Sequence, residues 1–249
     1  MSKRVGILTG CGKGIGLAIT KNLLSSNKDY YIVGISRSSN SELDSLRKLY
    51  KERFLFFESR IEDSKNILEI LDFVKKRYGE INFGICNAGI RSRLSISESS
   101  LEVFRNVLEI NTISNINIAK KLIAISLDNR SACNILFVSS IVGARGFDEL
   151  STYAVSKSAL EGFMRSASVE YAKDGIQLNC LAPGFVESSY AENFKENRKD
   201  LYEWTLAQTP MGRWGKCEEM ANIASFMISE QNSYMTGTTI YSDGGWTAK

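Results

Sequence analysis

Short apolar runs rich in β-branched residues alternate along the chain with longer segments in which apolar residues recur at helical spacing. The short runs lie at residues 5–9, 31–36, 54–57, 81–86, 134–139, 177–182 and 239–242. Segments with helical periodicity lie between them, among them 16–24, 64–78, 101–127, 152–173 and 218–229. Such alternation is typical of βαβ units whose parallel sheet is covered by helices on both faces.

This pattern predicts an α/β fold with a doubly wound parallel sheet, a three-layer sandwich of the Rossmann type. A chain of 249 residues is within the size range of a single α/β domain. No break in composition and no internal repeat divides it, so we predict one domain of this type over residues 1–249.

Glycine-rich and polar segments gather where the predicted strands end. They are residues 10–16 after the first strand, Ser36 and Arg37 at the second, 87–89 after the fourth, Ser140 after the fifth, and Pro183 with Gly184 after the sixth. Ligands of doubly wound sheets bind beyond the carboxyl ends of the strands. The sequence therefore predicts one ligand site at this edge of the sheet.

The segment after the first strand reads Thr-Gly-Cys-Gly-Lys-Gly-Ile-Gly over residues 9–16. Gly10, Gly14 and Gly16 permit a tight turn from strand to helix and a close approach of backbone N–H groups to a diphosphate. At the second strand, an acidic residue would accept hydrogen bonds from a ribose diol, whereas an arginine would neutralise a 2′-phosphate. Ser36, Arg37 and the nearby Lys13 include no acid, so the sequence favours NADP(H) over NAD(H).

Tyr153 and Lys157 form a tyrosine–lysine pair four residues apart, in a predicted helix that follows Ser140. Residues at this spacing share one helix face, so the ammonium lies beside the phenol. A nearby positive charge stabilises a phenolate and lowers its pKa toward neutrality. Ser140 can donate a hydrogen bond to a substrate oxygen, and Asn111 interrupts a helix that faces the same pocket. Residues 111, 140, 153 and 157 are therefore the predicted catalytic group.

Composition excludes several other chemistries. The net charge of +3 is too small and dispersed for a nucleic-acid footprint, and the chain contains no histidine for a Ser-His-Asp triad or an imidazole-ligated metal. Five widely spaced cysteines form neither a disulfide framework nor a zinc motif, so we predict no metal site. The sequence shows neither a secretory signal nor a membrane span, and we expect a cytoplasmic protein.

Together these motifs resemble the short-chain dehydrogenase/reductase family over essentially the whole chain. The resemblance rests on residues 9–16, 87–89, Asn111, Ser140, Tyr153 with Lys157, Pro183 with Gly184, 210–213 and 243–245. It implies that Tyr153 is the acid/base, Ser140 orients the carbonyl, Lys157 tunes Tyr153 and binds the nicotinamide ribose, and Asn111 positions a water. It also suggests a homotetramer, or at least a homodimer, built on the helices at 101–127 and 152–173.

The resemblance also implies a wider cofactor-binding set. In addition to the residues named at the first two strands and the Tyr–Lys pair, this set holds Ile15, Ile61, Asn87, Ala88, Gly89, Pro183, Gly184, Val186 and Ser188. Three positions depart from the family pattern. Arg60 replaces an aspartate that contacts adenine, Ser188 replaces a threonine, and Cys86 replaces the first asparagine of N-N-A-G.

The expected substrate is a small carbonyl or alcohol compound contacted by residues 187–209. Tyr190, Phe194, Tyr202 and Trp204 are candidates for an aromatic wall. Arg91, Arg93 and Arg145 lie near the predicted mouth, which leaves an anionic substrate open beside the alternative of solvated arginines.

Several functions remain open on the sequence. Reduction of a ketoacyl group on a carrier protein is weakened by Ser131 and Asp174, which stand where such enzymes carry basic docking residues, although Arg130 and Lys173 are adjacent. Sugar, sugar-nucleotide or polyol ketoreduction competes equally. A non-catalytic nucleotide sensor would not require the Tyr–Lys pair, and an epimerase or dehydratase favours another glycine spacing.

Overall fold

A computed structural model describes residues 3–188 and 194–249. Its centre is a seven-stranded, wholly parallel sheet in the order β3-β2-β1-β4-β5-β6-β9. The strands are β1 (Arg4–Thr9), β2 (Tyr30–Ser36), β3 (Phe54–Glu58), β4 (Phe83–Cys86), β5 (Cys133–Val138), β6 (Ile176–Pro183) and β9 (Thr239–Ser242). The chain reverses its strand order between β1 and β4, so the predicted doubly wound α/β fold is confirmed.

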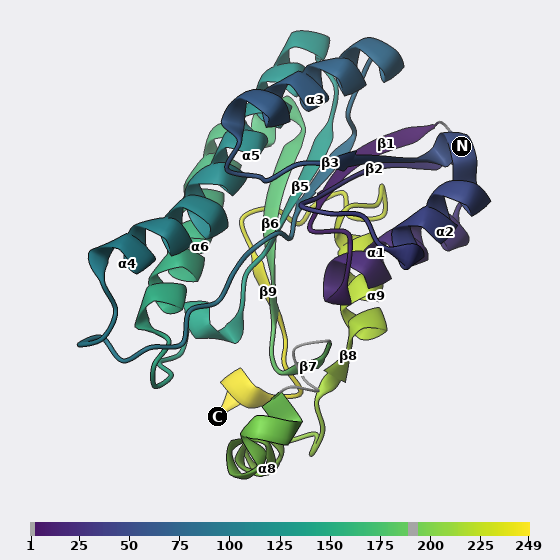
Figure 1. The fold of residues 1–249 in the computed structure, drawn as a ribbon. Coiled ribbons are helices and arrows are strands. Elements are labelled where there is room, and N and C mark those ends of the chain that lie inside the picture. The colour runs from purple at the N-terminus through teal and green to yellow at the C-terminus, as the bar shows by residue number, and fades with distance from the viewer. Residues whose placement is uncertain (1–2, 189–193) are drawn as a thin grey trace.

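Helices cover both faces of this sheet, which gives three layers (Figure 1). One face carries α1 (Gly14–Ser26), α2 (Ser41–Tyr50) and α9 (Cys217–Met227). The other carries α3 (Ser64–Tyr78), α5 (Ser114–Asn129) and α6 (Ser151–Tyr171), with α4 (Leu101–Leu108) lying along α6. None of the helices among the described residues is long and apolar enough to cross a membrane.

The remaining elements lie mostly at the carboxyl ends of the strands. Below the sheet in Figure 1 are α8 (Lys199–Gln208), the C-terminal turn η5 (Trp246–Ala248) and a small parallel pair, β7 (Val186–Glu187) with β8 (Gly215–Lys216). Short turns are η1 (Lys51–Arg53), η3 (Ile141–Gly143) and η4 (Ala172–Asp174), and η2 (Glu109–Ile113) is a π-helical turn between α4 and α5.

The predicted elements agree closely with the observed ones, with a few informative differences. The helix predicted over 101–127 is interrupted by η2, which contains Asn111. The strand predicted from residue 81 begins at Phe83, because Asn82 uses its side chain to accept a hydrogen bond from the Val5 amide at 2.7 Å. Helices α2 and α8 were not among the predicted segments.

Phe83 is one of the largest buried side chains in the core between the sheet and the face of α1 and α9. It is wholly buried at the start of β4, and its ring meets the edge of Tyr30 at 5.7 Å between centroids. It lies directly against Gly6 of β1, where a Cβ atom would come within 2.0 Å of the ring. The absent side chain at position 6 therefore makes room for the ring between neighbouring strands.

Replacing Phe83 by alanine should lower the free energy of unfolding by about 3–5 kcal/mol, because the packed surroundings cannot close the cavity. The matched control is Phe73→Ala on α3, where the side chain is 44% exposed and mainly loses an edge contact with Phe57. That change should cost about 1 kcal/mol. Urea denaturation of the two variants measures both values, and equal losses would contradict this description of the core.

Candidate active site

One cavity of about 730 Å³ runs along the carboxyl ends of β1, β2, β4, β5 and β6. It is lined by every residue predicted to bind the cofactor and by Ser140. These are Gly10, Lys13, Gly14, Ile15, Gly16, Ser36, Arg37, Ile61, Asn87, Ala88, Gly89, Tyr153, Lys157, Pro183, Gly184, Val186 and Ser188. The fold thus brings together segments that are far apart in the sequence.

The turn from β1 into α1 forms one end of this cavity. Gly10 has φ +70°, and a Cβ atom on Gly16 would come within 2.1 Å of the Gly10 carbonyl oxygen. Lys13 occupies the cap position of α1, but its side chain makes no capping hydrogen bond, and no acid lies in the first turn. The first N–H groups of α1 are therefore available to an anion, which fits the diphosphate of a dinucleotide.

Polar side chains at the end of β2 hold the glycine-rich turn in place. Ser36 Oγ accepts a hydrogen bond from the Gly12 amide at 3.1 Å, and Asn40 Nδ2 donates to the Gly12 carbonyl at 2.7 Å. Asn40 also caps α2 by accepting from the Leu43 amide. Lys13 and Arg37 are both exposed at the rim, so their cationic ends face the same end of the cavity.

Asn87 joins the loop after β4 to the loop after β1. Its Nδ2 donates to the carbonyl oxygens of Thr9 and Gly10, both at 3.1 Å, while Thr9 Oγ1 accepts from the amides of Asn87 and Ala88. These contacts fix the two loops at a constant separation. Asn87 therefore shapes the cavity wall with its side chain, in addition to lining it.

Lys157 projects from α6 toward the end of β5. The residue is only 4% exposed, and its Nζ donates to the Val138 carbonyl at 2.7 Å. The same nitrogen lies 5.5 Å from the centroid of the Tyr153 ring. A buried ammonium is costly without partners, and the carbonyl and the aromatic ring provide them.

The pKa of Tyr153 is set by opposing effects. Burial alone would raise it, but the charges of Lys157 and Arg91, together with hydrogen bonds from Arg91 and Ser140, outweigh burial and lower the pKa below its usual value. The Arg91 guanidinium carbon lies 5.2 Å from the ring centroid. Two cations and a hydroxyl thus favour the ionised phenol, as a group that exchanges protons near neutrality requires.

Ser140 lies directly after β5 and is buried in the cavity wall. Its Oγ accepts from the Val142 amide at 3.3 Å, which begins the turn η3, and it is hydrogen-bonded to Tyr153. The preceding Ser139 points the other way and donates to the buried Glu161 at 2.6 Å. The two neighbouring serines therefore have different surroundings, and only Ser140 meets the phenol.

Asn111 is fully buried behind the cavity and does not line it. Its side chain accepts from the Ile90 amide at 2.7 Å, and donates to the Ile90 carbonyl at 2.8 Å and to Ser156 Oγ at 3.0 Å. The π-helical turn displaces the carbonyls of Ile110 and Asn111, and Asn115 Nδ2 donates to both. The Asn111 side chain thus ties the loop after β4 to α6.

The predicted substrate-side residues divide into separate groups. Arg91 lines the main cavity, Arg145 and Trp204 line a second cavity, and Arg93 lines both. Phe194 also lines the second cavity, whereas Tyr202 packs edge-on against Trp214 at 5.0 Å and lines neither. Tyr202 packs in one cluster with Phe194 and Trp214, which line the two cavities, and its part in a substrate wall stays a prediction. Tyr190 lies outside the described residues.

Comparison with known proteins identifies the family. A family model described as enoyl-(acyl carrier protein) reductase matches residues 10–247. The 3-oxoacyl-acyl-carrier-protein reductase FabG of Rickettsia conorii is 31% identical over 245 residues, which cover 98% of this chain and 97% of the relative. The chain belongs to the short-chain dehydrogenase/reductase family. It is an NAD(P)H-dependent oxidoreductase that acts on CH–OH and C=O groups.

Solved structures of this family superimpose along the whole chain. The Cj0485 dehydrogenase is 29% identical with a TM-score of 0.91, covering 100% of this chain and 95% of that structure. The protein ElxO, solved with NADP bound, is 26% identical with a TM-score of 0.90 and covers 100% of both chains. The family resemblance inferred from the motifs is confirmed.

The departures from the family pattern have local explanations. Arg60 is exposed and pairs with Glu62 at 2.7 Å, and it is Glu62 that lines the cavity beside Ile61. Cys86 is buried, and its Sγ donates to the Asn115 carbonyl at 3.8 Å. Burial raises the pKa of Cys86 to about 12, so this thiol stays protonated.

Several lining residues were missed by the sequence reasoning. They include Asn40, Glu62, Phe147, Leu150, Phe185 and Trp214. Asn40 carries a readable signal, because an asparagine directly before a helix is a common cap. The aromatic residues carry none, since they reach the cavity only through the packing of loops that are distant in the sequence.

Replacing Arg91 by glutamine removes a cation and a hydrogen bond from Tyr153, so the pKa of Tyr153 should rise. If Tyr153 is the acid/base, as we predict, its ionised phenol accepts the proton in alcohol oxidation, and the rate should fall as the pH drops below that pKa. The acid limb of the pH profile of kcat/KM should therefore move to higher pH. Arg47→Gln on α2, far from Tyr153, is the control and should leave the acid limb of the profile unchanged. An unchanged acid limb in the Arg91 variant would show that Arg91 does not lower the pKa of Tyr153.

Proposed function

We propose that the protein catalyses NADP(H)-dependent interconversion of a ketone and an alcohol, with Tyr153 as the acid/base. The observation that carries the proposal is the Tyr153–Lys157–Ser140 group, which lies in the same cavity as the glycine-rich turn. A sensor of nucleotides would not need a phenol whose pKa is lowered by two cations. The geometry therefore favours catalysis over binding alone.

The chain's own residues suffice for the proton transfer. A bound dinucleotide, held by the turn of residues 10–16 and the loops after β2, β4 and β6, would supply or accept the hydride. In reduction, the Tyr153 hydroxyl donates its proton to the carbonyl oxygen, while Ser140 Oγ donates a hydrogen bond to the same oxygen. Lys157 stabilises the phenolate that remains. In oxidation the phenolate takes the proton from the alcohol.

Asn111 serves in this proposal as a positioning residue. Its side chain is committed to Ile90 and Ser156, the neighbours of Arg91 and Lys157. It therefore holds both cations at Tyr153 through the backbone. The family resemblance also implies a water in a proton relay, and this water would lie near the hydrogen bonds that Asn111 makes.

The choice of NADP(H) rests on the cations at the rim. Lys13 and Arg37 flank the end of β2, where a 2′-phosphate would lie, and the neighbours Ser36, Ser38 and Asn40 are uncharged. ElxO, which was solved with NADP bound, supports the same choice through its similarity over the full chain. Both observations favour the phosphorylated cofactor.

The proposed substrate is a small free ketone or alcohol, with a sugar or sugar-nucleotide derivative included. Relatives named as 3-oxoacyl-acyl-carrier-protein reductases favour a ketoacyl thioester as the second candidate. The surface of this chain argues for the first, because Ser131 and the exposed Asp174 occupy the places where a basic docking surface would be needed. Cytoplasmic location remains a prediction.

We also propose that α4, α5 and α6 form subunit contacts in a homotetramer or a homodimer. Apolar side chains on and beside these helices are exposed, among them Leu101 (71%) and Val169 (84%). Sedimentation at micromolar concentration should show an assembly larger than one chain. A single species of 27.8 kDa would contradict the proposal.

Tyr153→Phe should fold and bind NADPH but lose activity by about 10²–10⁴-fold, because it keeps the ring and removes the proton. Ketone-dependent loss of NADPH absorbance measures turnover, and quenching of tryptophan fluorescence measures cofactor binding. Tyr202→Phe, which changes a tyrosine that lines neither cavity, is the matched control. Activity of the Tyr153 variant within a few-fold of the parent would remove Tyr153 from the mechanism.

The parent should prefer NADPH over NADH by at least about tenfold in kcat/KM, since two exposed charge contacts of roughly 1 kcal/mol each suffice. Arg37→Gln should reduce this preference, and the double variant Ser36→Asp, Arg37→Gln should reverse it, because a carboxylate accepts from the ribose hydroxyls and repels a phosphate. Added salt should weaken the preference. A parent protein that favours NADH would show that Lys13 and Arg37 do not determine the choice of cofactor.

A further inference from the structure

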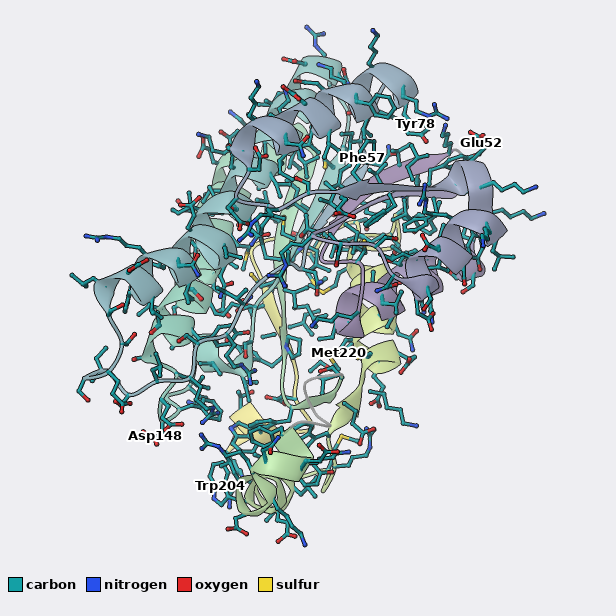
Figure 2. The ribbon with its side chains drawn as sticks, in the orientation of Figure 1. Glu52, Phe57, Tyr78, Asp148, Trp204 and Met220 are labelled. Carbon is teal, nitrogen blue, oxygen red and sulfur yellow. The ribbon has the colours of Figure 1, made fainter. Side chains whose placement is uncertain are left out.

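A second cavity of about 750 Å³ adjoins the main one at the end of the molecule that carries α8 and the C-terminal turn. The two cavities share Arg93, Phe147 and Phe185 in their walls. Figure 2 shows Asp148, on the loop before α6, and Trp204 of α8 at this same end of the molecule. A substrate whose reacting carbon lies near Tyr153 can therefore extend into the second cavity.

The charged side chains of this second cavity are mainly cationic. Among the described residues that line it, four are basic and two are acidic: Arg93, Arg145, Arg198 and Lys249 against Asp148 and Glu149. Glu149 is shared by Arg93 at 3.3 Å and Arg198 at 3.7 Å. One carboxylate therefore forms ion pairs with two guanidinium groups, so the side chains that line the cavity keep an excess of positive charge.

Arg93 occupies the junction of the two cavities and lacks one hydrogen bond. Its Nη1 meets Glu149, but its Nε is buried and has no hydrogen-bond partner in the described structure. A buried donor without an acceptor is unfavourable. The Nε atom itself is shielded, but the Arg93 side chain is 21% exposed and lines both cavities. The exposed part of its guanidinium could therefore bind a carboxylate or phosphate of a ligand through charge-assisted hydrogen bonds.

The backbone around Glu149 keeps Arg93 in this position. Glu149 has φ +59°, a left-handed conformation that is unusual for a residue with a side chain. Its carbonyl accepts from the Leu94 amide at 3.0 Å, so the segment of Arg93 and the loop before α6 are joined through both backbone and side chain. Local strain of this kind persists only where the surroundings fix it.

Aromatic side chains form the apolar part of the same cavity. Trp246 stacks on Phe147 with ring centroids 5.8 Å apart and meets the edge of Trp204 at 5.6 Å. Trp204 is 47% exposed although it is a large apolar side chain. A cationic junction beside an aromatic wall matches a ligand that has both an anionic group and an apolar body.

We propose that the second cavity is a substrate subsite that selects ketones carrying a carboxylate or phosphate joined to an apolar body, with Arg93 binding the anionic group. This inference rests on the proposed carbonyl reduction, because it places the reacting carbon beside Tyr153. It goes beyond that reaction by assigning the substrate class and the residue that recognises it.

Matched acids and esters test the assignment. The probes are γ-benzoylbutyrate and δ-benzoylvalerate, each compared with its methyl ester, so that only the charge differs within a pair. Reduction is followed by NADPH absorbance, and binding by tryptophan fluorescence in the Tyr153→Phe variant, since Trp204 and Trp246 line the cavity. The acid of at least one pair should be favoured by about tenfold in both measurements, as a charge-assisted contact predicts.

Arg93→Gln should abolish this preference, and Arg198→Gln, at a more exposed member of the cluster, should weaken it. The matched control is Arg77→Gln, whose guanidinium pairs with Glu52; Figure 2 shows Glu52 at the opposite end of the molecule from Asp148. The control should keep the full preference. Acids and esters that bind equally in both pairs, or a preference that survives both cavity variants, would overturn the subsite.

The two proposals fail differently. If the esters are reduced through Tyr153 and the acids are neither bound nor reduced better, the anionic subsite is wrong and the proposed reaction stands. If the acids bind with a dependence on Arg93 but no probe is reduced, the subsite stands and the proposed reaction is contradicted.

Discussion

The contact between the Lys157 ammonium and the Val138 carbonyl is the constraint on which the rest of the site depends. It joins α6 to the end of β5, the strand that also delivers Ser140. Because a buried ammonium must be compensated, α6 can approach the sheet only where a carbonyl at the end of a strand meets Lys157. Tyr153 lies one turn earlier on the same helix, with its ring 5.5 Å from the Lys157 nitrogen. This contact thus holds the helix and places the phenol, whose pKa is lowered by Lys157 together with Arg91 and Ser140.

The π-helical turn supports this arrangement from behind. Asn111 uses both ends of its amide on Ile90 and reaches Ser156 as well, so the segment of Arg91 and the helix of Lys157 are held by one side chain. Asn115 then satisfies the carbonyls that the π turn displaces, and its own residue is almost fully buried. Substitution at either asparagine would leave buried backbone groups without partners, which explains why an irregular turn persists within a long helix.

The sequence reveals most of this fold and the principal site residues, because both depend on local patterns. Strand and helix periodicity predicts the sheet and its covering helices. Because ligands of such sheets bind beyond the carboxyl ends of the strands, the sequence also predicts that Gly10, Arg37 and Ser140 meet at one edge. The position of Asn111 behind the wall was not predictable, because it follows from hydrogen bonds to residues twenty or more positions away. The second cavity was also hidden, since Trp246 and Trp204 meet only after the C-terminal turn packs against α8.

Titration of Tyr153 itself tests the central claim most directly. The difference in phenolate ultraviolet absorbance between the parent and Tyr153→Phe isolates this one group as the pH is raised. The account predicts that Tyr153 ionises below the ordinary tyrosine pKa of about 10, and that Lys157→Met moves the transition to higher pH. A transition above the ordinary value in the parent would contradict it, since burial would then outweigh the cations and the phenol could not serve as the acid/base.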